Sequence, residues 1–290
     1  MSRNSVGNVF RVSALLCLVC SLVVSTAAVG LKSFQEANKL REKQKNVLLA
    51  AGLVESDVAN ETITEVYKAR VRPEIIDLET GKPVEEGETV ESDGEEITVP
   101  AEYDQRAAER SEDLTVAVDE SARREFGYPI PREVRFAEIY LIKAEGEDES
   151  IEQIVLPIRG KGLWSTMYGF LALKFDPSKS DPSERYVING ITYYEQGETP
   201  GLGGEVENEK WKKQWDGKVA YNSDWDPQIS VDKGGSGESH IDALAGATIT
   251  SNGVQSMVNF WLSKYGFRNY LESLDPDQKS QTASLPVERN

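Results

Sequence analysis

Hydrophobic residues form one continuous run near the start of the chain. The twenty residues from Val12 to Leu31 carry no charged side chain, and Arg11 and Lys32 flank them. A helix of that length, at about 1.5 Å per residue, crosses the roughly 30 Å hydrocarbon core of a bilayer. A cleaved signal peptide is the alternative, because residues 25–28 resemble a small-residue cleavage site, but its apolar core usually has only about 7 to 15 residues. The pattern predicts an uncleaved membrane anchor at 12–31.

Three polar segments behind the anchor show a helical pattern. Residues 33–49 continue the membrane helix or leave it at an angle, residues 61–70 form a short helix, and residues 114–126 form a third. Between the last two, the segment 74–113 has fifteen Asp and Glu residues against three Lys and Arg residues, a net charge of −12. This acidic segment is expected to be a solvated excursion, and a solubility device explains it better than a cation-attracting site.

Alternating apolar residues predict strands farther along the chain. Residues 132–142 and 151–158 flank a charged turn and are expected to form a hairpin, and residues 188–194 form another strand. The predicted fold class is α+β: one N-terminal transmembrane helix, then a mixed α/β domain with an antiparallel sheet and flanking helices.

The last predicted helix has five apolar residues on one face: Val254, Met257, Val258, Trp261 and Leu262. Thr250, Ser251 or Asn252 can cap its start. Gly266 can end it. Thr248 is therefore expected just upstream of the helix, where free amides and the helix dipole favour a phosphate group.

Two glycine-rich stretches precede this helix, at residues 160–173 and 197–204. Closely spaced glycines let the backbone approach a ligand, and Trp164 offers a stacking face. The first stretch does not fit the dinucleotide-binding pattern G-x-G-x-x-G, because its third glycine is missing and strand-like residues follow. By itself each stretch is weak evidence for a binding site.

Composition excludes several classes of function. The net charge is 32 − 49 = −17, which repels nucleic acid. The two cysteines, Cys17 and Cys20, both fall in the apolar run and are interpreted as small apolar residues of a membrane helix. His240 is the one histidine, for which a surface or packing role is expected, so a Ser-His-Asp or Cys-His centre lacks its parts. No catalytic side chain and no metal site are predicted.

Residues 160–170, 198–206 and 242–253 together resemble the C subunit of the Na⁺-translocating NADH:quinone reductase family. In that family FMN is attached by a phosphoester bond to the last Thr of a D-x-x-S/T-G-A-T motif. The resemblance covers roughly residues 133–271 and the anchor, and it implies that Thr248 carries the covalent FMN. Ala245 stands where the family usually has Ser or Thr, and Thr250 and Ser251 are the nearby alternative acceptors.

Further contacts to FMN are expected from the same stretches. Trp164 and Leu202 are candidates to flank the isoalloxazine ring, and Glu198 and Thr199 to hydrogen-bond the ring edge or the ribityl chain. The remaining expected contacts come from the 197–204 stretch and from the residues around Thr248: Gly203, Gly246, Ala247 and Ser251.

The resemblance implies an electron-transfer subunit. It would relay electrons from an iron–sulfur centre in the membrane subunits to another covalent FMN, while NADH oxidation, ubiquinone reduction and sodium export belong to the complex. Its implied partners are the other subunits, a flavin transferase for maturation and the lipid bilayer, with no nucleic acid. Three alternatives remain: the flavin subunit of the ferredoxin:NAD⁺ oxidoreductase complex, a stand-alone flavin reductase, and a non-redox membrane assembly subunit.

The expected organisation places the soluble domain on the periplasmic side of a bacterial inner membrane, on a single-pass anchor. Local positive charge favours the opposite orientation, but long domains often translocate regardless of it. The expected segments are a cytoplasmic N-tail at 1–11, the transmembrane helix at 12–31, a membrane-proximal helical region at 32–130, the FMN-binding domain at 131–271 and a polar C-terminal tail at 272–290.

Overall fold

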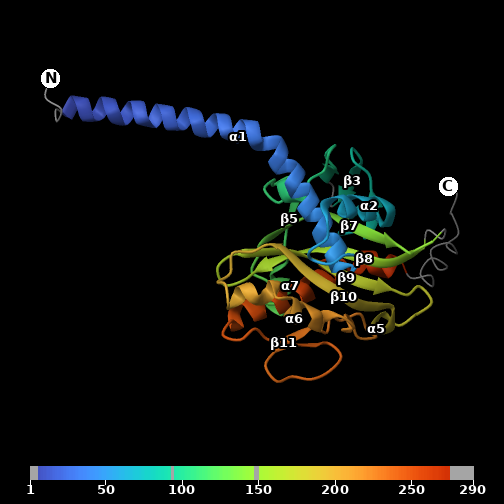
Figure 1. Ribbon diagram of the computed structural model, residues 1–290. Coiled ribbons are helices and arrows are strands. Elements are labelled where there is room, and N and C mark those ends of the chain that lie inside the picture. Colours follow the sequence, from blue (N-terminus) through green and yellow to red (C-terminus); the bar gives the residue numbers. More distant parts are fainter. Residues whose placement is uncertain (1–5, 93–94, 147–149, 275–290) are drawn as a thin grey trace, which may run out of the picture. The chain divides into compact units, whose positions relative to one another are not determined.

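A computed structural model describes residues 6–92, 95–146 and 150–274 (Figure 1). The chain divides into two compact units, Met1–Lys43 and Gln44–Asn290. Residues 1–5 of the expected N-tail and 275–290 of the expected C-terminal tail lie outside the described residues.

Helix α1 runs from Val6 to Ala50, so residues 33–49 continue the apolar helix without a break. Its most apolar 18-residue window has a mean hydropathy of 2.4 and no buried residue, which makes α1 long and apolar enough to cross a membrane. The last turns of α1 belong to the second unit, where Val47 and Leu48 are fully buried.

The second unit is organised around a six-stranded antiparallel sheet with the order β10-β9-β8-β7-β1-β2. The expected hairpin is confirmed for β7 and β8, but residues 132–134 of its first strand form a separate strand, β6, that pairs with β5 (Thr115–Ala117). The expected strand at 188–194 lies within β10. The strands of this sheet are β1 (Val71–Asp77), β2 (Lys82–Val84), β7 (Phe136–Lys143), β8 (Ile151–Lys161), β9 (Thr166–Phe175) and β10 (Tyr186–Glu195).

Shorter elements surround the sheet. The other strands are β3 (Thr89–Ser92), β4 (Glu95–Thr98), β5 (Thr115–Ala117), β6 (Arg132–Val134), β11 (Ser230–Asp232) and β12 (His240–Asp242). The helices are α2 (Asn60–Arg70), α3 (Gln105–Ala108), α4 (Glu120–Glu125), α5 (Pro182–Arg185), α6 (Glu209–Lys212), α7 (Thr248–Leu262) and α8 (Arg268–Ser273), with 3₁₀ turns η1 (Gly203–Glu207) and η2 (Lys213–Trp215).

Alternate residues of β8 face two hydrophobic layers. Ile154 and Leu156 contribute to the layer that contains α7, whereas Val155 contributes to the layer that contains the end of α1 and α2 (Figure 1). The Thr192 hydroxyl of β10 donates a 3.1 Å hydrogen bond to the Asn46 carbonyl oxygen, which ties the end of α1 to the sheet.

The prediction of a helix at residues 114–126 is wrong. Its first residues form β5, which pairs antiparallel with β6, and the helical part is confined to α4. The Asp119 carboxylate accepts a 2.6 Å hydrogen bond from the Ser121 amide, and this cap starts α4 at Glu120. Pairing between segments that are distant in sequence therefore overrides the local helical pattern.

The acidic segment 74–113 is only partly solvated. The prediction that it is a solvated excursion is therefore wrong for its buried acids. Asp77 ends β1 and is 1% exposed, and its Oδ1 lies 2.5 Å from Arg135 Nε. The Glu109 carboxylate lies 2.7 Å from Arg159 Nη1 of β8. Arginines from later in the chain neutralise these acids, so this part of the acidic segment can pack against the sheet. The sheet therefore includes residues well before residue 131.

Candidate functional site

Thr248 is the first residue of α7 and is exposed. The helix therefore starts earlier than expected, and Thr250 and Ser251 do not cap it. Ala247 occupies the cap position and provides no side-chain hydrogen bond. Gly246 just before it has φ of 73°, a conformation that favours glycine. The helix ends at Leu262, with Ser263 rather than Gly266 at its C-cap, so the expected end is also corrected.

The two other hydroxyls of the first turn are buried. Thr250 Oγ1 donates a 2.7 Å hydrogen bond to Glu198 Oε2. Ser251 Oγ accepts a 3.0 Å hydrogen bond from the Leu244 amide and donates one of 3.0 Å to the Ala247 carbonyl oxygen. Both hydroxyls thus hold protein segments together, and Thr248 presents the accessible hydroxyl of this turn.

Glu198 lies at the centre of the site and is 5% exposed. Its Oε1 accepts hydrogen bonds from the Trp164 amide at 2.9 Å and the Ser165 amide at 3.0 Å, and its Oε2 accepts one from the Leu163 amide at 3.0 Å. Burial opposes ionisation of this carboxyl, but its hydrogen bonds outweigh burial and lower its pKa. The Glu198 carboxylate, expected to hydrogen-bond the flavin ring edge or the ribityl chain, is directed at protein donors.

Glycines allow three segments to meet around that carboxylate. A Cβ on Gly162 would lie 2.5 Å from the Glu198 carboxylate, and a Cβ on Gly253 of α7 would lie 2.1 Å from the Lys161 carbonyl oxygen. Gly203 is buried against the Thr250 hydroxyl. These glycines bring α7 and the 198–204 loop against the turn between β8 and β9.

Large apolar side chains are exposed on the same three segments. They are Leu163 at 49%, Trp164 at 71%, Leu202 at 43% and Ile249 at 58% exposure. Among the described residues of the second unit, only Val116 is also a large exposed hydrophobic side chain. We call these four residues the apolar platform. Contacts of Glu198, Thr250 and Gly203 hold the backbones of these residues beside the start of α7.

The remaining expected contact residues lie in the flanking loops. The Thr199 side chain is exposed, and its carbonyl oxygen accepts hydrogen bonds from the Leu202 and Gly204 amides, both at 3.0 Å. Gly246 lies beside Leu202, whose Cδ2 would be 3.1 Å from a Cβ at that glycine. The structure thus brings Trp164, Leu202 and Thr248 into one region, whereas the polar groups of Glu198 and Ser251 serve the protein framework.

Leu163 and Ile249 were not predicted as site residues. Ile249 lies nine residues before Val258, about 180° around the helix from the buried face. An apolar residue on the solvent side of α7 is the signal that identifies it. His240 lies on β12, and its Nε2 is 3.2 Å from Asp232 Oδ1.

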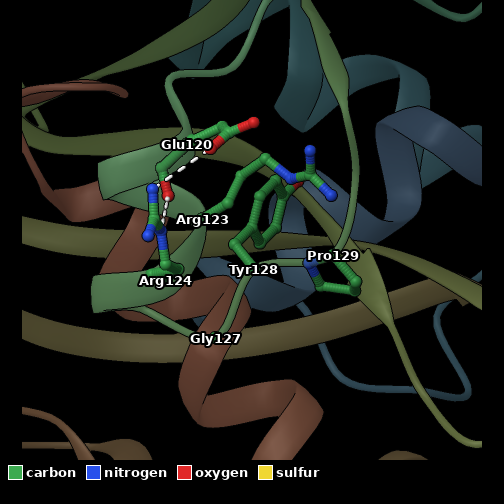
Figure 2. Close-up of a pocket in the computed structure, with 6 residues that line it drawn as sticks. All are labelled: Glu120, Arg123, Arg124, Gly127, Tyr128 and Pro129. Atoms are coloured by element: carbon green, nitrogen blue, oxygen red, sulfur yellow. Dashed lines mark hydrogen bonds and ion pairs between the residues drawn. The ribbon is translucent and has the colours of Figure 1, made fainter.

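A separate pocket of about 560 Å³ lies near the other end of α7 (Figure 2). Its lining residues are Glu120, Arg123, Arg124, Gly127, Tyr128 and Pro129. Tyr128 stacks on Phe260 of α7 at a centroid distance of 3.8 Å, and Phe260 lies twelve residues, about 18 Å, beyond Thr248. Figure 2 shows Arg124 paired with Glu120 among these lining residues. The pocket shares no lining residue with the apolar platform.

Comparison with known proteins identifies the same region. The FMN-binding domain family matches residues 162–263. The chain is 39% identical over 276 residues to the C subunit of the Na(+)-translocating NADH-quinone reductase of Yersinia pestis, covering 94% of each chain. It is 40% identical over 273 residues to the C subunit of the Vibrio alginolyticus reductase, covering 93% of this chain and 95% of the relative.

Solved structures agree with the sequence comparison. The crystal structure of Shewanella oneidensis NqrC has a TM-score of 0.66 and 29% identity, covering 82% of this chain and 98% of that one. The corresponding structure from Parabacteroides distasonis, at 21% identity and a TM-score of 0.56, shares the fold. The chain therefore belongs to the NqrC family, the C subunits of the Na(+)-translocating NADH-quinone reductases, and is part of that oxidoreductase complex.

Proposed function

We propose that this chain carries FMN as a phosphoester on Thr248 and relays electrons within the reductase complex. The observation that carries the proposal is the exposed position of Thr248 at the start of α7, beside the apolar platform. The helix N-terminus provides free amides and a favourable dipole for the phosphate. The platform provides apolar and aromatic surface for the isoalloxazine ring.

The residues of the site fit this group. Trp164 and Leu202 would flank the ring, Gly246 and Ala247 would approach the phosphate, and the buried Thr250 and Ser251 leave Thr248 as the acceptor. Bound FMN supplies one-electron or two-electron transfer. The protein would hold the group between these side chains and leave an edge of the ring open to partners.

Attachment requires a flavin transferase and an activated flavin nucleotide. The Thr248 oxygen forms a bond to the phosphorus of the flavin nucleotide, the bond from that phosphorus to its nucleotide leaving group breaks, and the hydroxyl proton passes to a base of the transferase. In the complex, the chain would take electrons from an iron–sulfur centre in the membrane subunits and pass them to a second covalent FMN, while the complex exports sodium.

The test is co-expression of the full chain with a flavin transferase, followed by intact mass spectrometry and peptide mapping. A mass gain of one FMN on the peptide that contains Thr248 is expected, and it should be absent in Thr248→Val but retained in Thr248→Ser. Flavin on Thr250 or Ser251 in the valine variant would contradict Thr248 as the acceptor. A native chain that gains no flavin would refute the proposed function.

We further propose that the second unit lies on the periplasmic side of the inner membrane. The sequence allows a clean test, because its two cysteines, Cys17 and Cys20, both lie in α1. A single cysteine at the exposed Ser236 would be labelled in intact spheroplasts by a membrane-impermeant maleimide. Labelling only after lysis would place the unit in the cytoplasm.

A further inference from the structure

We propose that Glu198 is a positioning residue for the flavin site. Its buried carboxylate joins the turn that presents Trp164 to the helix that presents Thr248, and so sets the acceptor hydroxyl relative to the stacking face. This inference rests on the proposed function, because it concerns the attachment of FMN at that site.

The turn between β8 and β9 binds the Glu198 carboxylate through its backbone amides. Three consecutive amides, those of Leu163, Trp164 and Ser165, donate to one carboxylate at 2.9 to 3.0 Å. The Ser165 hydroxyl donates a further hydrogen bond of 3.2 Å to Glu198 Oε1. Consecutive amides of this kind form an anion-binding loop, and here the anion is an internal side chain rather than a phosphate.

Helix α7 binds the same carboxylate through a side-chain hydroxyl. Thr250 follows Thr248 by two residues, and its hydroxyl donates to Oε2 of the same carboxylate at 2.7 Å. Gly162 and Gly203 leave room for the carboxylate between the segments, since a Cβ on either would lie within 2.9 Å of a Glu198 carboxylate oxygen. Five donors therefore satisfy one buried charge, and they come from two segments that carry opposite sides of the site.

The chemistry of glutamine shows why the charge matters. An amide has one acceptor oxygen, so in Glu198→Gln the NH₂ group must face either the Trp164 and Ser165 amides or the Leu163 amide. Thr250 can reverse its hydroxyl to accept from that NH₂ group, but a backbone amide cannot. At least one amide of the turn therefore loses its acceptor, and the turn loosens while the volume of the side chain is unchanged.

Thr250 offers a gentler test of the same link. Thr250→Val keeps the branched shape of the side chain but removes the hydroxyl, so the turn keeps its bonds to Glu198 and only the bond to α7 is lost. Thr250→Ser restores the hydroxyl and serves as the rescue variant. Glu209→Gln is the matched control for charge, because Glu209 is exposed on α6.

The experiment uses the full chain in detergent micelles, prepared without flavin and then incubated with a flavin transferase and its flavin nucleotide. The initial rate of mass gain is measured for each variant. We expect Glu198→Gln and Thr250→Val to slow attachment on the order of tenfold, the effect of one lost charge-assisted hydrogen bond. Thr250→Ser and Glu209→Gln should react at the native rate.

A second readout does not depend on flavin. Amide hydrogen exchange in the unmodified chain should be faster at Leu163 to Ser165 in Glu198→Gln, with exchange in the sheet unchanged. If Glu198→Gln does not fold, the comparison of Thr250→Val with Thr250→Ser still decides the question. Native attachment rates in Thr250→Val would overturn the positioning role, whereas failure of the native chain to gain flavin would refute the proposed function itself.

Discussion

Gly253 of α7 lies against the carbonyl oxygen of Lys161 at the end of β8, so close that a Cβ on Gly253 would be 2.1 Å from that oxygen. The oxygen belongs to the backbone and cannot move aside as a flexible side chain could. This contact determines how near the first turns of α7 come to the turn that carries Trp164.

Gly253→Ala should therefore destabilise the fold although alanine favours a helix. The gain in helix propensity is about 0.5–1 kcal/mol, whereas overpacking of this kind typically costs about 1–3 kcal/mol. The measurement is urea unfolding of the full chain in detergent. The neighbouring Asn252→Ala, at an exposed position of the same helix, is the control and should be neutral. Unchanged or increased stability of Gly253→Ala would contradict the contact.

Replacement of Trp164 should change the fluorescence of the attached flavin but not the stability of the fold. Its side chain is 71% exposed, so Trp164→Ala is expected to change the free energy of unfolding by less than about 0.5 kcal/mol. Loss of the stacked ring should raise the fluorescence of the attached flavin. Trp225→Phe, outside the three segments of the site, is the comparison and should leave that fluorescence unchanged. Equal flavin fluorescence in native chain and Trp164→Ala would place the ring elsewhere.

Ala245 provides a test of how the transferase recognises this chain. It is exposed in the loop before Gly246, so a hydroxyl added by Ala245→Ser meets solvent or the transferase rather than the core. We expect faster attachment of FMN at an unchanged melting temperature. The measurement is the initial rate of mass gain against the native chain, with Ala243→Ser as a nearby comparison. An unchanged rate would show that the family hydroxyl at this position has no part in recognition.

Stability should fall as the pH rises through neutrality. Burial raises the pKa of Glu133 to about 7, above its ordinary value of 4.5, although Arg159 Nε lies 2.7 Å from its carboxylate and opposes the shift. The folded chain thus binds this proton more tightly than the unfolded chain. The stabilisation is complete below about pH 4.5 and is lost as the pH rises through about 7.

Glu133→Gln removes this titration. Its melting temperature, measured relative to that of the native chain from about pH 5 to about pH 8, should therefore rise with pH. Glu198 has a lowered pKa, so its contribution is lost only as the pH falls below its ordinary value, outside this range. A difference between the two chains that does not vary with pH would contradict the raised pKa of Glu133.

Two truncations should separate the anchor from the folded unit. Removal of residues 1–43 leaves the second unit intact and should preserve its melting temperature. Removal of residues 1–51 also deletes the buried Val47 and Leu48, each worth roughly 1.5–3 kcal/mol, and should destabilise the unit by several kcal/mol. Thermal unfolding followed by circular dichroism measures both. Equal melting temperatures would show that the end of α1 is dispensable.

Local sequence patterns predicted the elements whose structure depends on residues close together in the chain. The charge-free run predicts α1, and the spacing of Val254, Met257 and Trp261 predicts the buried face of α7. The same patterns failed at 114–126 and at Asp77. There the partners that decide the structure, β6 and Arg135, lie later in the chain, and strand pairing or charge neutralisation with them outweighs local propensity.

The sequence by itself determined the family motif, the position of Thr248 near the start of a helix and the aromatic residue at 164. Only the tertiary structure decided which hydroxyl is accessible and where the Glu198 carboxylate points. The physical reason is that burial and hydrogen bonding depend on segments far apart in the chain, such as those of Glu198 and Thr250, which are 52 residues apart. Thr248 stays exposed because the two hydroxyls that follow it are used to hold the protein around it.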